Sequence, residues 1–226
     1  MFLAIFEVRP KAERFDEYLA LAKRLRPTLE KIKGFVDNER FQSKWRAGWV
    51  LSLSTWRDEK SMVRWRTMGV HHMAQKQGSA EILKDYYLRI GDVTVDTDAP
   101  DNAPIREQRF DETEIGAKFA TVTELTPERE GCNVAAALGL DRSRQGLVDY
   151  GLFASIYNSD KLALLTLCTD RRSSGGWLPV KPEGVRMVRH RGVRIIRDYG
   201  MFDRREAPQF FSDARGHETR HPDPVR

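Results

Sequence analysis

The stretch that decides the fold is residues 34–58, GFVDNERFQSKWRAGWVLSLSTWRD, which returns in altered form at residues 146–170, GLVDYGLFASIYNSDKLALLTLCTD. The two stretches lie 112 positions apart and are identical at seven of 25 positions without a gap. Random pairing at average composition would give about one or two identities. We therefore expect two copies of one structural unit in this chain. The identical pairs are Gly34/Gly146, Val36/Val148, Asp37/Asp149, Phe41/Phe153, Ser43/Ser155, Leu53/Leu165 and Asp58/Asp170.

The region before the first copy predicts a strand followed by a helix. Residues 2–8 are apolar and β-prone and end just before Pro10, which is typical of a strand. Apolar residues then recur at gaps of three and four, which predicts one face of a helix. Within that helix, Pro27 predicts a kink or a split, and Gly34 predicts the end. The apolar face consists of Phe15, Leu19, Ala22, Leu25, Leu29 and Ile32.

The first copy itself predicts a hairpin, and a helix and a further strand follow it. Two β-prone runs, residues 35–42 and 49–56, flank a loop that contains glycine, which is a hairpin signal. Asp58 is a typical N-cap residue for the helix that follows, and Gly69 predicts a break within it. Residues 86–95 alternate well enough to form the closing strand. The order β-α-β-β-α-β is the split βαβ, or ferredoxin-like, motif.

The second half repeats this order in an eroded form. Strands are expected over residues 119–125 and 188–196, with a shorter first helix over 133–140. Two glycines and two prolines within residues 171–182 exclude a long second helix there. We expect an α+β fold in which two ferredoxin-like units pack sheet against sheet into one intramolecular barrel, with a ligand space between the sheets. The expected divisions are residues 1–98 for the first unit, 99–116 for a linker, 117–206 for the degenerate second unit and 207–226 for a polar tail.

Composition and charge exclude several classes of protein. The chain has 226 residues, of which 40% are hydrophobic and 31% charged, as is typical of globular proteins. The net charge is +5, but Lys and Arg alternate with Asp and Glu and no nucleic-acid-binding motif occurs. No apolar run reaches the roughly 20 residues that cross a bilayer. Two cysteines without metal-site spacing fit a reducing compartment. We therefore expect a cytoplasmic protein that binds no nucleic acid, membrane or metal and that can form homo-oligomers.

Residues 55–93 combine a strand that ends in tryptophan, an acidic helix start, a Trp-Arg pair, a His-x-x-Ala-Gln-x-x-Gly segment and an aromatic pair before a strand. We place these motifs at Trp56, Asp58, Trp65-Arg66, His72 to Gly78 and Tyr86-Tyr87. In this combination the chain resembles the antibiotic biosynthesis monooxygenase family of dimeric α+β barrels. The resemblance covers residues 2–96 and is faint over 117–200. It implies an oxygen-using monooxygenase that acts on a small aromatic substrate, phenolic or polyketide-like.

Within this resemblance, His72 is the candidate base and Trp65 the candidate stacking residue. A neutral imidazole can take a proton from a phenol or ligate haem iron. Trp65 lies seven residues before His72, about two helical turns, so both should fall on nearly one face. The side chain of His71 should point about 100° away from that of His72. The alternative is that His72 packs at the helix surface and Trp65 is a core residue under the sheet.

Aromatic residues on the predicted strands are candidates for the wall of the substrate site. One alternating set of strand residues must line the barrel interior, and the alternative role for each aromatic residue is ordinary core packing. His190 lies between two arginines and is expected on the exposed face, with anion or haem-propionate binding as a further role. The candidate wall residues are Phe6, Phe41, Trp56 and Tyr86.

The resemblance implies a reaction without a cofactor, and haem is the alternative, because the family includes both cofactor-free and haem-degrading monooxygenases. If haem binds, His72 or His71 is the expected ligand. Two departures from the haem-degrading branch count against iron ligation. The ligand position of that branch falls near Gln75, and the asparagine of its first strand is replaced here by Phe6. A ligand-binding barrel without catalytic activity is the third hypothesis.

Overall fold

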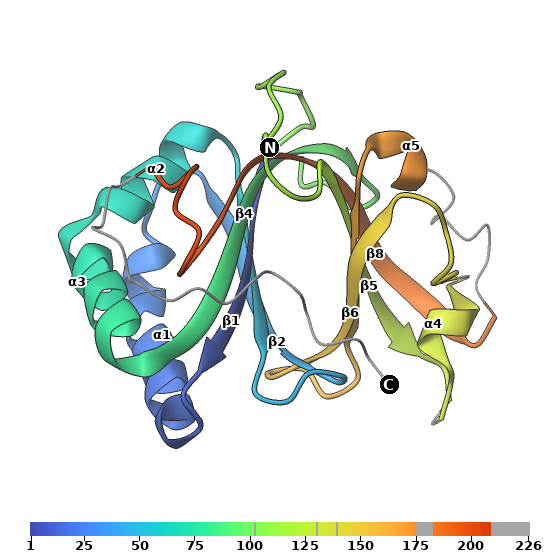
Figure 1. The fold of residues 1–226 in the computed structure, drawn as a ribbon, viewed down its shortest axis with the longest axis horizontal. Helices are drawn as coiled ribbons and strands as arrows, with labels where there is room; N and C mark the ends of the chain where they lie inside the picture. Colours follow the sequence, from blue (N-terminus) through green and yellow to red (C-terminus); the bar gives the residue numbers. More distant parts are fainter. Residues whose placement is uncertain (102, 130, 139, 175–182, 209–226) are drawn as a thin grey trace.

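Eight antiparallel strands close into one barrel in the computed structural model, which describes residues 1–208 except 102, 130, 139 and 175–182 (Figure 1). The strand order around the barrel is β1-β3-β2-β6-β7-β5-β8-β4. The first half of the chain therefore contributes the neighbours β4-β1-β3-β2, and the second half contributes β8-β5-β7-β6. The two halves have the same internal strand order, and the α+β barrel predicted from the sequence is confirmed.

The two halves differ in their helices. The long helices of the first half lie on the outer side of its strands, whereas the helices described in the second half are single turns (Figure 1). The first half comprises β1 (Phe2–Pro10), η1 (Ala12–Arg14), α1 (Phe15–Leu29), β2 (Phe35–Ser43), β3 (Val50–Trp56), α2 (Glu59–Thr67), α3 (Gly69–Gln77), η2 (Gly78–Ile82) and β4 (Leu83–Asp96). The second half comprises β5 (Phe119–Pro127), α4 (Val134–Ala137), β6 (Leu147–Ser155), β7 (Leu162–Cys168), α5 (Arg171–Ser174) and β8 (Val185–Gly200).

The sequence repeat has a structural basis at its two ends. Gly34 adopts a φ of 93°, and a Cβ at this position would overlap the side chain of Ser61. The backbone N–H of Ser61 in turn donates to the carboxylate of Asp58, the N-cap of α2, at 2.8 Å. The same arrangement recurs 112 positions later, around Gly146 with a φ of 85°. Each copy thus joins the start of one strand to the start of the helix after the hairpin.

The first helix differs from its prediction at its C-terminal end. α1 runs without a split through Pro27 and ends at Leu29. Because Pro27 lies in the last turn, the missing N–H weakens only the end of the helix and does not divide it. Gly34 does not cap this helix. It lies in the turn before β2, where its positive φ is required.

The predicted break in the second helix is present, one residue before Gly69. Met68 is extended, with a ψ of 132°, and separates α2 from α3. No residue of α3 is fully buried, although His71 is largely covered, and the helix continues into η2, a single π-helical turn. The break means that residues on either side of Met68 no longer follow one helical phase.

The barrel interior contains a core that both halves share. Buried ion pairs accompany this core, among them Glu7 with Arg46 and with Arg89. The ligand space predicted between the sheets is reduced to a cavity of about 150 Å³ that is lined mainly by charged residues. The buried core residues include Leu3, Ile5, Phe41, Leu51 and Leu53 from the first half and Val122, Phe153, Leu165, Val193 and Ile195 from the second.

The prediction for His190 is wrong, because the side chain is only 4% exposed. The Nδ1 atom of His190 lies 2.8 Å from the hydroxyl of Thr123 on the neighbouring strand. The two flanking arginines are also buried. Each forms an ion pair, Arg191 with Glu124 and Arg189 with Asp96. Arginines that form ion pairs with neighbouring strands do not mark an exposed face.

Three sequence predictions cannot be compared with the described residues. The part of the predicted tail beyond residue 208 and most of the Gly- and Pro-rich segment, residues 175–182, lie outside the described residues. The division of the chain at residues 98, 116 and 206 stays a prediction. Among the described helices, none is long and apolar enough to cross a membrane.

Candidate active site

The first half encloses a cavity of about 490 Å³ between the outer face of its strands and the helices α1, α2 and α3. Strands β1 to β4 and the end of β8 form the floor of this helix-side cavity, and the three helices form its roof (Figure 1). Its volume lies in the usual range of sites for small molecules. The prediction placed the ligand space inside the barrel, and the larger space lies on the opposite face of the sheet.

Aromatic side chains form much of the cavity wall. Trp56 and Trp65 line it near one end of the strands, where both pack in one cluster with Phe2. Phe6 and Tyr86 line it further along, with their ring centroids 5.6 Å apart. Such rings exclude water and present flat apolar surfaces to a bound molecule.

His71 is the histidine on the cavity wall. Its ring stacks on that of Trp65, with centroids 4.2 Å apart and planes 15° apart. Its Nδ1 atom lies 3.2 Å from the carbonyl oxygen of Trp65. Because a carbonyl oxygen only accepts, Nδ1 carries the proton and the lone pair is on Nε2. Burial lowers the pKa of His71 to about 4, so the imidazole is neutral at physiological pH.

Polar residues occupy the floor of the cavity on the two strands β2 and β3. The amide of Asn38 donates to the hydroxyl of Ser52 at 3.2 Å and to the carbonyl oxygen of Leu53 at 2.6 Å. Its Oδ1 atom accepts a hydrogen bond from the guanidinium of Arg40 at 2.8 Å. We call Asn38, Arg40 and Ser52 the polar floor. Further arginines line the cavity at Arg66, Arg197 and Arg204.

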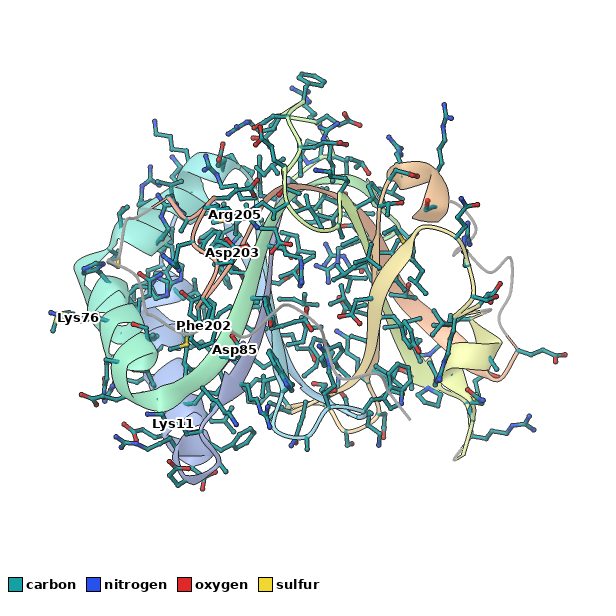
Figure 2. The ribbon with its side chains drawn as sticks, viewed as in Figure 1. Lys11, Lys76, Asp85, Phe202, Asp203 and Arg205 are labelled. Atoms are coloured by element: carbon teal, nitrogen blue, oxygen red, sulfur yellow. The ribbon has the colours of Figure 1, made fainter. Side chains whose placement is uncertain are left out.

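The segment after β8 closes one side of the cavity. The N–H of Met201 donates to the carbonyl oxygen of Tyr86 at 3.0 Å, so this segment lies against the start of β4, where Figure 2 labels Asp85, Phe202 and Asp203. Arg204 then donates to the hydroxyl of Tyr86 at 2.6 Å. Burial raises the pKa of Tyr86, so its hydroxyl stays protonated.

Comparison with known proteins identifies the family. Residues 1–77 match the family model described as antibiotic biosynthesis monooxygenase. The chain is 41% identical over 223 residues to the jasmonate monooxygenase ABM of Pyricularia oryzae, an alignment that covers 95% of this chain and all of that protein. This chain belongs to the antibiotic biosynthesis monooxygenase family. The family resemblance drawn from the sequence is thereby confirmed, and the chain is an enzyme, a monooxygenase.

The fold of this family member also resembles that of a solved structure with low sequence identity. A crystal structure of aldoxime dehydratase superimposes with a TM-score of 0.53 at 10% identity, covering 86% of this chain and 81% of that one. The likeness concerns the fold, and it agrees with two ferredoxin-like halves within a single chain.

The sequence analysis named His72 as the candidate base, whereas His71 is the histidine that lines the cavity. Trp65 lies beside His71, whereas His72 does not line the cavity. The spacing of seven residues between Trp65 and His72 does not place them on one face, because the chain leaves the helix at Met68. The motif His-x-x-Ala-Gln-x-x-Gly, counted back from Gly78, begins at His71. Counting the motif back from Gly78 was therefore the sequence signal that indicates His71.

The predicted wall residues of this monooxygenase fall on two different faces of the sheet. Phe6, Trp56 and Tyr86 line the helix-side cavity, and Trp65 lines it too. Phe41 does not, because it points into the barrel core and is 0% exposed. On β2 the neighbouring position, Arg40, faces the cavity instead, as strand alternation requires. Sequence reasoning did not select Asn38, Arg40 or Ser52.

Proposed function

We propose that the chain is an oxygen-using monooxygenase whose substrate is a small, largely apolar molecule of the jasmonate kind, bound in the helix-side cavity. The observation that carries the proposal is this cavity of about 490 Å³, with aromatic walls and the neutral imidazole of His71 on its surface. The relative from Pyricularia oryzae is a jasmonate monooxygenase, and it aligns along its whole length with this chain. That relationship supports a lipid-derived substrate in place of the phenolic one expected from the sequence.

In this proposal His71 accepts a proton from the substrate. The lone pair of Nε2 is available for this step, because Nδ1 is fixed by the carbonyl oxygen of Trp65. Removal of a proton makes the substrate more electron-rich and therefore more reactive toward oxygen. In the net reaction one methylene of the substrate becomes a carbonyl: one oxygen atom enters the product, and the other leaves as water with the two hydrogens of that carbon. The substrate itself thus supplies all four electrons. Trp65 holds the imidazole in place, and Phe6, Trp56 and Tyr86 keep water away from the anion.

Haem is the alternative occupant of the same cavity, and the residues present fit it. If haem bound, Nε2 of His71 would provide a nitrogen ligand, and arginines on the cavity wall, such as Arg66 and Arg197, would pair with the propionates. When bound, haem would supply oxygen activation at its iron. Among the described residues, no group of three or more His, Cys, Asp or Glu could hold a metal ion directly.

Two measurements on the purified chain test the proposal. Oxygen uptake should rise on addition of jasmonate, and the absorption spectrum should show no Soret band before or after the reaction. A Soret band in wild type that disappears in His71→Gln would show that His71 is an iron ligand and not a base. Absence of oxygen uptake with jasmonate, in a protein without haem, would overturn the proposed substrate class.

A further inference from the structure

The polar floor is an unusual feature for a surface that lies beneath helices. Asn38, Arg40 and Ser52 occupy the side of β2 and β3 that faces α1, where sheets normally present apolar residues to helices. Ser52 is 7% exposed, and Asn38 joins it to Arg40 by hydrogen bonds. A polar cluster at such a place costs stability relative to well-packed apolar residues, so a purely structural role explains it poorly.

The second half of the chain provides an internal comparison for the same positions. With the offset of 112, Asn38, Arg40 and Ser52 correspond to Tyr150, Leu152 and Leu164. The two leucines are buried in an apolar cluster with Leu125 and Val134, which fills the equivalent space under α4. The barrel therefore folds with apolar residues at these positions. The polar set is specific to the half that contains the cavity.

Arg40 has hydrogen-bonding capacity that the protein leaves unused. Its Nε atom is buried and has no acceptor, and Arg40 forms no ion pair with a carboxylate of the described residues. Its guanidinium also lies near the hydroxyl of Tyr18 on α1, where it partly offsets the rise in the pKa of Tyr18 caused by burial. Glu59 is an acidic residue of the cavity wall, and Arg109 already binds its carboxylate at 2.8 Å.

We propose that Arg40, held in place by Asn38, binds a carboxylate of the substrate and so makes this monooxygenase specific for small apolar acids. The inference rests on the proposed function and names the group that the cavity recognises. A carboxylate in the cavity would accept hydrogen bonds from the guanidinium of Arg40, which lines the cavity and forms no ion pair with a carboxylate of the described residues. Jasmonate is an acid of this class, with one carboxylate on an apolar carbon skeleton.

The position of Arg40 also fixes the orientation of the bound acid. Arg40 on β2 pairs with Ser52 on β3. Trp56 is the last residue of β3 and lies four residues after Ser52, roughly 13 Å along the strand. Trp65 packs in the same cluster as Trp56, and its ring stacks on the ring of His71. An acid anchored at Arg40 therefore extends its apolar body toward the Trp65 and His71 end of the cavity, where the proposed chemistry takes place.

Two other arginines of the cavity, Arg197 and Arg204, are placed differently from Arg40. Arg197 lies on β8, which β4, β1 and β3 separate from β2, so the two edges are roughly 19 Å apart. The charge of Arg197 acts on Asp111 outside the cavity. Arg204 already donates to Tyr86 and to the carbonyl oxygen of Gly200. Arg197 is thus the competing candidate for the anchor, with the same charge on the opposite side of the cavity floor.

The test compares the binding of jasmonate and of its neutral methyl ester to the full chain by isothermal titration calorimetry. Wild type should bind the acid more tightly than the ester. Arg40→Leu, which copies Leu152 of the second half, should weaken binding of the acid by roughly 10- to 100-fold and leave the ester unchanged. Arg40→Lys should retain part of the preference, and Arg197→Leu should change the ratio of the two affinities by less than about threefold. The melting temperature of Arg40→Leu should not fall, which separates loss of the anchor from loss of the fold.

Several outcomes would overturn the anchor. Equal binding of acid and ester by wild type, or a preference that survives Arg40→Leu, would show that Arg40 does not recognise the carboxylate. A preference that disappears in Arg197→Leu but not in Arg40→Leu would place the anion at the opposite edge of the sheet. Failure of wild type to bind either compound would overturn the proposed function itself, and this inference with it.

Discussion

The ring of His71 stacks on the ring of Trp65 across the break between α2 and α3, with centroids 4.2 Å apart. The carbonyl oxygen of Trp65 accepts from Nδ1 of the same imidazole at 3.2 Å. One residue of α2 thus determines both the position and the tautomer of a histidine on α3. The consequence is a neutral imidazole on the wall of an apolar cavity, with its Nε2 lone pair available.

The first prediction concerns the two neighbouring histidines. His71→Gln should lower turnover of jasmonate by about 10² to 10⁴, the usual contribution of a general base. His72→Gln is the matched control and should keep turnover within about threefold, because His72 does not line the cavity. Oxygen uptake at saturating substrate measures both. The reverse ranking of the two variants would return the role of base to His72.

The second prediction concerns stability at acid pH. Burial lowers the pKa of His71 from 6.5 to about 4, so between these values the unfolded chain binds a proton more readily than the folded one. The stabilisation of the folded chain by neutral His71 is therefore fully present above pH 6.5 and is lost as the pH falls toward 4. By pH 4.5 the loss should be about 2 to 3 kcal/mol in the free energy of unfolding.

Urea unfolding of wild type and His71→Gln at pH 7 and pH 4.5 isolates this contribution. Burial also lowers the pKa of His190, which contributes a pH dependence of the same sign to both proteins. The variant should lose less stability than wild type between the two pH values. Identical losses would mean that the imidazole of His71 is not buried in its neutral form.

The third prediction concerns the glycine that begins the repeat. Gly34→Ala adds a Cβ both at a φ of 93° and in the space of the Ser61 side chain. Gly48→Ala is the matched control, because its φ is 78° and no atom lies within 4 Å of the added Cβ. Gly34→Ala should therefore cost about 1 to 3 kcal/mol more than Gly48→Ala in denaturant unfolding. Equal costs would show that the contact with Ser61 is unimportant.

The fourth prediction separates the roles of the two halves. Leu164→Ala, in the apolar cluster of the second half, should cost about 2 to 5 kcal/mol of stability and leave kcat and KM unchanged while the protein is folded. Leu88→Ala makes the same chemical change in the cavity wall and should raise KM. Steady-state kinetics below the melting transition distinguish them. A raised KM in Leu164→Ala would mean that the apolar cluster under α4 contributes to the site.

The fold could be predicted from the sequence because its signals are local and occur twice. Gly34 and Gly146 mark positive φ, and Asp58 and Asp170 mark helix starts, so each copy predicts the same hairpin and turn. The short first helix of the second half, expected over residues 133–140, is present as α4, whereas the glycines and prolines of residues 175–182 lie outside the described residues. The exact end of α1 was not predictable, since a proline in a last turn and one that splits a helix look alike in sequence.

The site could be predicted only in part, because it depends on which face of the sheet each residue occupies. Phe6 and Phe41 are both strand aromatics, but alternation within one strand does not tell how two strands are aligned. Only the register that pairs Phe6 with Ser52, and Ser52 with Arg40, shows that Phe41 faces the other side. The choice between His71 and His72 likewise depended on the extended backbone at Met68, because Gly69 predicted a break in the helix but not the change of face that the break causes.

The most direct test of the central claim is the transfer of heavy oxygen from labelled oxygen gas to jasmonate, with the cavity open and with the cavity blocked. Ala4 lies on the cavity floor, and Ala4→Phe should fill the space that the substrate needs. Mass spectrometry should show one labelled oxygen atom in the product of wild type and no product from the folded Ala4→Phe variant. Labelled product at an undiminished rate from that variant would contradict the account, because oxygenation would then take place outside the helix-side cavity.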